Sequence, residues 1–220
     1  MQAFGDPHWE YHTTITKIWA LLAAKLVDTP IIPFNATEYT TKLQDYLKAA
    51  KDKATQAQHS HLSSLNPSPS LQAADIHVDL DIGLDRFFAP LSTSLTRLAT
   101  AAASFDAEAA HLQAALDAGA DRKIPWWKWW QRVKLYMRVR ALNGKYKMLE
   151  RQFLHAPGLD GRDWFKHVVF APGLWTGYSG ATYPGIVEAF EHGRADWESA
   201  ARWVRIVEGK VEAAVGLLEG

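Results

Sequence analysis

Residues Leu91 to Leu116 read LSTSLTRLATAAASFDAEAAHLQAAL, a stretch with an unbroken helical pattern. Its apolar residues recur in alternating steps of four and three, at Leu91, Leu95, Leu98, Ala102, Phe105, Ala109, Leu112 and Leu116. This heptad-like seam is typical of a helix that packs lengthwise along other helices in a bundle. The stretch therefore predicts an all-α fold.

Apolar spacing and Gly/Pro punctuation on both sides of this seam predict further helices. The expected helices cover residues 10–28, 35–58, 80–118, 126–154, 184–192 and 195–219. The first has an apolar face at Tyr11, Ile15, Ile18 or Trp19, Leu22 and Leu26. Pro90 falls inside the third helix, where we expect a kink or a break. Together these predict one domain over residues 1–220, a bundle of four to five long helices.

The stretch from Leu149 to Phe190 does not follow a simple helical pattern. It holds most of the Gly/Pro punctuation of the chain and a cluster of aromatic residues. Turn residues fix a backbone path, and large aromatic residues contribute most to cores and interfaces. We therefore predict an irregular Gly/Pro/aromatic insert before the last two helices, with a specifically shaped surface. Its one strand-like run is KHVVFA, from Lys166 to Ala171.

Composition excludes several classes of protein. The 24 basic and 24 acidic residues give a formal net charge of zero, so overall charge predicts no binding to polyanions. The chain has no cysteine, which removes disulfides, thiolate metal sites and cysteine nucleophiles. No apolar run approaches the roughly 18 residues of a membrane-spanning helix, and the N-terminus does not resemble a signal peptide. We expect a soluble chain.

Motifs for catalysis are also missing from the sequence. Neither a nucleophile elbow nor a phosphate-binding glycine loop occurs, and Ser179 in GYSGATYPG has the wrong spacing for the elbow. Two histidine pairs, His8 with His12 and His59 with His61, have spacings compatible with sharing a metal ion. No carboxylate-rich partner motif accompanies either pair, so we expect surface histidines. The prediction is a chain without catalytic residues, metal or cofactor.

The segment from Arg122 to Arg151 is unusual in charge, with ten Lys/Arg residues and one acidic residue. Basic residues interleaved with aromatics are typical of surfaces that bind nucleic acid or an anionic membrane. A stand-alone binding module that uses helix 122–151 in this way is therefore the alternative function. Apolar residues recur through the segment with the basic residues between them, which favours an ordinary bundle helix, and no nucleic acid is expected.

Four tryptophans, Trp126, Trp127, Trp129 and Trp130, span an arc of about 160° on a helix. One bundle cannot bury them all, so some are exposed or face a partner. Together with Trp164 and Trp175 they are the candidate interface residues. Separately, Asn35-Ala36-Thr37 is an N-glycosylation sequon, which makes Asn35 a candidate glycosylation site.

Three motifs carry a resemblance to a known family. LERQFL, GLDGRDWFKHVVFAPG and GYSGATYPGIVEAF follow one another between Leu149 and Phe190, and GDPHWEYHTTITKIWALLAAKLVDTPIIPFNATEYT precedes them. In this order they resemble the C-terminal part of the transferrin-receptor and glutamate-carboxypeptidase-II group. The resemblance covers nearly the whole chain and is weak from about Ala57 to Trp130. The APGLW run is more similar to fungal or vacuolar members.

The resemblance implies a helical dimerisation domain of a larger single-pass membrane protein of the secretory or vacuolar pathway. Its partners would be a second copy, for homodimerisation, and the peptidase-like and apical domains of the same parent chain. The zinc ligands and general base of the family lie upstream of the matching region, so zinc is expected only in that missing domain. In glutamate-specific members a Lys-Tyr pair binds the terminal carboxylate of the substrate. The matching positions are Gly177 and Tyr178, so only the Tyr178 candidate remains.

Overall fold

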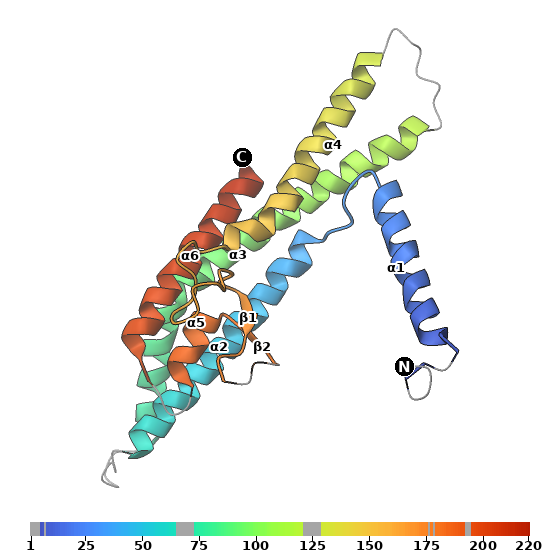
Figure 1. The fold of residues 1–220 in the computed structure, drawn as a ribbon. Coiled ribbons are helices and arrows are strands. Elements are labelled where there is room, and N and C mark those ends of the chain that lie inside the picture. The colour runs from blue at the N-terminus through green and yellow to red at the C-terminus, as the bar shows by residue number, and fades with distance from the viewer. Residues whose placement is uncertain are drawn as a thin grey trace. The chain divides into compact units, whose positions relative to one another are not determined.

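A computed structural model describes residues 5–6, 8–64, 73–120, 129–175, 177, 179–191 and 195–220. The side chains of residues 61–64, 73–82 and 119–120 are not among those described. Six α-helices follow one another along this part of the chain, with one short sheet (Figure 1). The prediction of an all-α bundle is confirmed.

The long helices are α1 (Glu10–Asp28), α2 (Ala36–Ser64), α3 (Ala73–Ala120), α4 (Trp129–Leu149) and α6 (Trp197–Glu219). A 3-10 turn, Glu150–Phe153, follows α4. The short α5 (Pro184–Val187) is followed by a second 3-10 turn, Glu188–Phe190, where we expected a continuous helix to residue 192. The Lys166–Ala171 run forms a strand only at its end, where β1 (Phe170–Pro172) is antiparallel to β2 (Gly180–Thr182), with Ala171 opposite Ala181. Earlier in the run, His167 forms an isolated antiparallel bridge with Leu154.

Helix α3 confirms the seam, and it is not broken at Pro90, where we expected a kink or a break. Seven of the eight seam residues, from Leu91 to Leu112, are buried, and Leu116 is half-buried. The helix nevertheless runs without interruption through Pro90. Proline removes one backbone hydrogen bond, but Pro90 and Arg86, four residues earlier, are both exposed, so water can satisfy the freed carbonyl. Phe88 and Leu91, both fully buried, anchor the helix on either side.

The chain forms two compact units. The first consists of residues 1–34 and 108–146, and the second of residues 35–107 and 147–220. In the second unit, α5 and the Glu150–Phe153 turn both contact α6. The buried face of α6 includes Trp203, Val207 and Val211, and the Asp196 side chain caps its start by accepting from the amide of Ser199 at 3.0 Å.

In the first unit, the segment after α1 is attached to α4 by Asn143. The Asn143 Nδ2 donates to the carbonyl of Pro30 at 2.8 Å, and the Ile32 amide donates to its Oδ1 at 3.0 Å. Phe34 adds an edge-to-face contact with Tyr146, with ring centroids 5.7 Å apart. Helix α1 itself has no buried residue. Its predicted apolar face therefore exists as a helix face, but no described residue of the first unit covers it.

Candidate functional site

The insert between α4 and α6 is built around a buried arginine. Arg162 is 7% exposed, and its Nη1 donates to the carbonyl of Pro172 at the end of β1, at 2.5 Å. Its Nη2 forms an ion pair with the Glu188 carboxylate, in the turn after α5. Burial raises the pKa of Glu188, and the neighbouring Arg162 charge offsets this only in part. One guanidinium thus connects three parts of the insert.

A second polar cluster joins the insert to α2. The Nδ1 of His167 accepts from the amides of Val169 at 3.2 Å and Phe170 at 3.1 Å, which places the ring proton on Nε2. That Nε2 lies 3.0 Å from Oε1 of Glu150, and the Tyr39 side chain hydrogen-bonds the same carboxylate. Burial raises the pKa of Glu150, but the hydrogen bonds from His167 and Tyr39 outweigh it, and the net pKa lies below the usual range.

This cluster predicts acid sensitivity. Because the folded-state pKa of Glu150 is lowered, its stabilisation is present above the unfolded pKa near 4.5 and is lost as pH falls through the folded value. We expect Glu150→Gln to cost about 1 kcal/mol near neutral pH, a figure reduced because the side chain is half-exposed. The cost should shrink towards zero in strong acid, as measured by urea unfolding across pH. Tyr39→Phe should give a smaller loss with the same trend, and a cost of Glu150→Gln that did not depend on pH would contradict the assignment.

Five apolar side chains of the insert are exposed. We define the insert surface as five exposed residues of the second unit: Leu154, Trp164, Phe170, Leu174 and Trp175. The two tryptophans are 67% and 54% exposed, respectively. Exposed apolar residues gathered on one segment mark an interaction surface, whereas scattered ones do not. The polar clusters inside the insert fix its backbone, so this surface has a defined shape.

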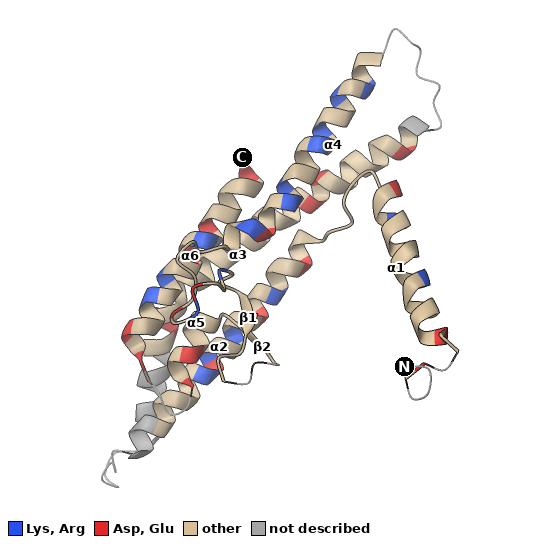
Figure 2. Cartoon of the chain, viewed as in Figure 1, with Lys and Arg blue, Asp and Glu red and all other residues tan. Residues whose placement is uncertain are grey.

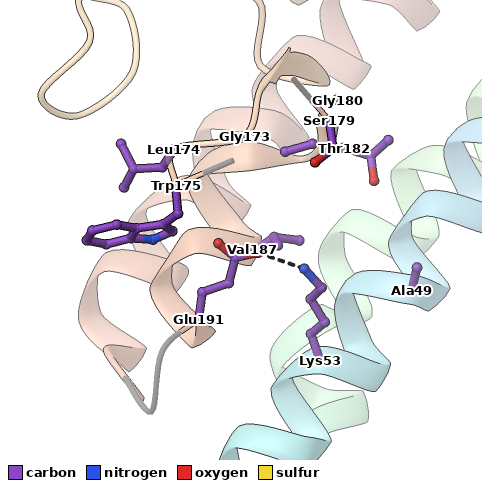
Figure 3. Close-up of a pocket in the computed structure, with 11 residues that line it drawn as sticks. Ala49, Lys53, Gly173, Leu174, Trp175, Ser179, Gly180, Thr182, Val187 and Glu191 are labelled. Atoms are coloured by element: carbon purple, nitrogen blue, oxygen red, sulfur yellow. Dashed lines mark hydrogen bonds and ion pairs between the residues drawn. The ribbon is translucent and has the colours of Figure 1, made fainter. Parts of the chain in front are cut away.

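A cavity of about 380 Å³ lies beside this surface (Figure 3). Lys53 of α2 and Glu191 line it and pair with each other at 2.7 Å. Trp175 and Ser179, from the loop between β1 and β2, also line it. The positive charge of Lys53 is already balanced by Glu191, so the described part of this cavity offers no unopposed charge for a ligand.

The predicted carboxylate-binding position can be judged only in part. Tyr178 lies outside the described residues. Gly177 has a φ of 59°, in the left-handed region that side-chain-bearing residues rarely adopt. A lysine at this position would therefore be strained in the present backbone.

The remaining candidates are dispersed over the molecule. Trp129 and Trp130 are exposed on α4, in the first unit, whereas Trp164 and Trp175 belong to the second. Trp126 and Trp127 lie outside the described residues. Asn35 is exposed, and its Oδ1 accepts from the Glu38 amide at 2.7 Å, so it caps α2 whether or not it is glycosylated.

Histidines and acidic residues do not gather in the described part of the chain. His12 pairs with Asp6 through Nδ1 at 2.6 Å. Among the described residues, no group of three His, Asp or Glu side chains is placed to hold a metal ion. The same residues include no helix with the length and apolar character needed to cross a membrane.

The sequence did not reveal that the apolar face of α1 is exposed. Besides its predicted face, Leu21 and Val27 on other sides of this helix are exposed. A helix that is buried on one side in a bundle carries polar residues on the other side. The apolar residues of α1 outside its main face were therefore the sequence signal that it is not an ordinary bundle helix.

Comparison with known proteins identifies the family. The transferrin receptor-like dimerisation domain matches residues 87–219, more than half of the chain. The chain belongs to this family. The match runs from within α3 to the end of α6 and includes the whole insert.

Relatives of this dimerisation domain extend the match to α1 and α2. A probable glutamate carboxypeptidase of Arabidopsis thaliana is 25% identical over 225 residues, which cover 100% of this chain and 26% of the relative. The aminopeptidase NAALADL1 of Rattus norvegicus is 26% identical over 220 residues, which cover 100% of this chain and 24% of the relative. The vacuolar protein sorting-associated protein 70 of Saccharomyces cerevisiae is 23% identical over 209 residues, which cover 94% of this chain and 22% of the relative. The chain spans about a quarter of the length of these relatives, which come from plants, animals and fungi.

Proposed function

We propose that this chain is the non-catalytic association domain of a larger glutamate-carboxypeptidase-like protein, where it pairs with a second copy and docks on the peptidase-like part of its parent. The match to the dimerisation family over residues 87–219 carries the proposal. The uncovered apolar surfaces of the chain support it. Any zinc would be held by the peptidase-like part, where the family resemblance places the zinc ligands. Its relative in yeast is named for vacuolar sorting, which is consistent with a parent of the secretory or vacuolar pathway.

We assign self-association to α1. Its uncovered face consists of Tyr11, Ile15, Ile18, Trp19, Leu22 and Leu26, all exposed. A regular apolar helix face is self-complementary when two copies pack antiparallel around a two-fold axis.

We assign docking on the parent to the insert surface. Unlike α1, the insert surface has an irregular backbone held by the buried Arg162 and by the cluster around Glu150. A shaped surface of this kind suits one specific, non-identical partner. The cavity lined by Lys53 and Glu191 lies at the border of the insert surface and makes that surface more irregular in shape.

Sedimentation analysis of the chain tests both assignments. We expect a dimer whose dissociation constant rises about tenfold or more in Ile15→Ser/Leu22→Ser, because two large apolar side chains leave the interface. Leu21→Ser/Val27→Ser is the matched control, since it makes the same change on the sides of α1 away from the face.

A monomer at all concentrations, or a dimer unaffected by Ile15→Ser/Leu22→Ser, would contradict the assignment of α1. The insert variant Trp164→Ser/Trp175→Ser is expected to leave the dimer intact. If it dissociates the dimer instead, the insert surface belongs to the dimer interface and the docking assignment is wrong.

A further inference from the structure

Helix α4 has two apolar faces, only one of which is buried. Val139, Leu142 and Tyr146 are each less than a tenth exposed and follow one another on one side of the helix. With about 100° between successive residues, the first half of the helix presents a second apolar group on the opposite side. A bundle helix needs only one such face for its core.

We define the exposed aromatic face of α4 as Trp129, Trp130, Val133, Tyr136 and Met137, which are 63%, 46%, 45%, 63% and 56% exposed. These positions fall within an arc of about 120° on the helix. Two tryptophans, a tyrosine and a methionine side by side in water are unfavourable unless something covers them at least part of the time.

The charge of α4 indicates what covers this face. From Trp129 to Leu149 the helix has six Lys/Arg residues and no acidic one. Lys and Arg are shown in blue along the helix in Figure 2. Arg132 and Lys134 border the exposed aromatic face on its two sides, and the Lys134 Nζ lies 4.4 Å from the ring centroid of Trp130. Arg138 pairs with Glu108 of α3 at 3.3 Å. The partner of this face must therefore tolerate or attract positive charge.

The same helix of a second copy does not fit this requirement. Two α4 helices packed face to face around a two-fold axis would bring two sets of six basic residues together, without an acidic residue on either helix to balance them. The near-neutral α1 has no such obstacle, so the proposed dimer does not account for the exposed aromatic face of α4.

We infer that the exposed aromatic face of α4 binds the surface of an anionic lipid bilayer. Tryptophan and tyrosine are favoured at the headgroup level, where an apolar ring and a polar N–H or O–H are both accommodated. Arg132 and Lys134 reach from the two edges of the face towards lipid phosphates and carboxylates. Because Val139, Leu142 and Tyr146 already hold the helix from behind, binding requires no helix formation. The contact is peripheral, with the helix lying along the membrane surface.

Co-sedimentation of the 220-residue chain with lipid vesicles tests this inference. Binding is expected to vesicles that contain phosphatidylserine and to fall strongly with pure phosphatidylcholine or with added salt. Trp129→Ser/Trp130→Ser should weaken binding about tenfold or more, because the inserted rings are lost. Arg132→Gln/Lys134→Gln/Arg140→Gln should weaken it about a hundredfold on phosphatidylserine vesicles. All five side chains are exposed, so both variants should unfold like the wild type.

The matched control is Lys42→Gln/Lys48→Gln/Lys166→Gln, which removes three exposed charges from other parts of the chain and should retain binding. Equal binding to neutral and anionic vesicles would overturn the inference, as would equal loss in the control. Tighter binding to single-stranded nucleic acid than to phosphatidylserine vesicles would assign the face to nucleic acid instead. Dissociation of the dimer by Trp129→Ser/Trp130→Ser would assign it to protein association.

Discussion

Replacing Arg162 by leucine is expected to lower the free energy of unfolding by about 3–5 kcal/mol. The substitution removes the charge that pairs with Glu188 and the donor that satisfies the carbonyl of Pro172. The side chains of Arg162 and Glu188 are only 9% and 13% exposed, so water cannot replace the lost partner. Glu188 would be left as a buried, unpaired carboxylate, which is costly.

Two variants separate this effect from the general loss of an arginine. Arg97→Leu removes an exposed partner of Glu212, a pair 2.7 Å apart, and should change stability by no more than about 1 kcal/mol. Arg162→Leu/Glu188→Leu removes both buried charges and should recover much of the loss. Urea unfolding of the three variants provides the comparison. An effect of Arg162→Leu as small as that of Arg97→Leu would show that the buried pair contributes little.

The parts of the fold that depend on local pattern could be predicted from the sequence. The spacing from Leu91 to Leu116 specifies a buried seam, and Asp196 is a capping residue immediately before an apolar run. Both signals lie within a few residues of the structure that they determine. We expected a kink or a break at Pro90, and the helix is not broken there, because the local rule omits the burial of Phe88 and Leu91, which stabilises the helix through the proline.

The candidate site depends on contacts that are distant in sequence. Arg162 meets Glu188, 26 residues later, and Glu150 meets Tyr39 from α2. Nothing in the local pattern around Arg162 distinguishes a buried arginine from a surface one. The exposure of a helix face is equally hard to predict from local pattern. The apolar faces of α1 and α3 have similar spacing, but only the face of α3 is buried. Periodicity indicates that a face exists, and only tertiary structure shows what packs on it.

Gly158→Ala is expected to be the second most damaging of the proposed changes, with a loss of about 3 kcal/mol or more. Gly158 has a φ of 83°, and a Cβ there would lie 2.2 Å from the carbonyl oxygen of Asp163. The clash is with backbone, so no side-chain rotation relieves it. The turn must open instead, and it contains the bonds from the Leu159 amide to the Phe165 carbonyl at 2.9 Å and from the Arg162 amide to the Leu159 carbonyl at 2.9 Å.

Gly161→Ala is the matched control in the same turn. Gly161 also has a positive φ, 68°, but no atom lies within 4 Å of a Cβ built there. Its substitution adds backbone strain without a clash and should cost only about 1 kcal/mol. Gly158 lies at the start of the turn that positions Arg162, so its substitution should also reduce the effect of Arg162→Leu. The loss of unfolding free energy in the double variant should therefore be smaller than the sum of the losses in the two single variants. Equal losses for the two glycine variants in urea unfolding would mean that the turn relaxes around the added methyl group, and full additivity with Arg162→Leu would mean that the turn does not hold the arginine in place.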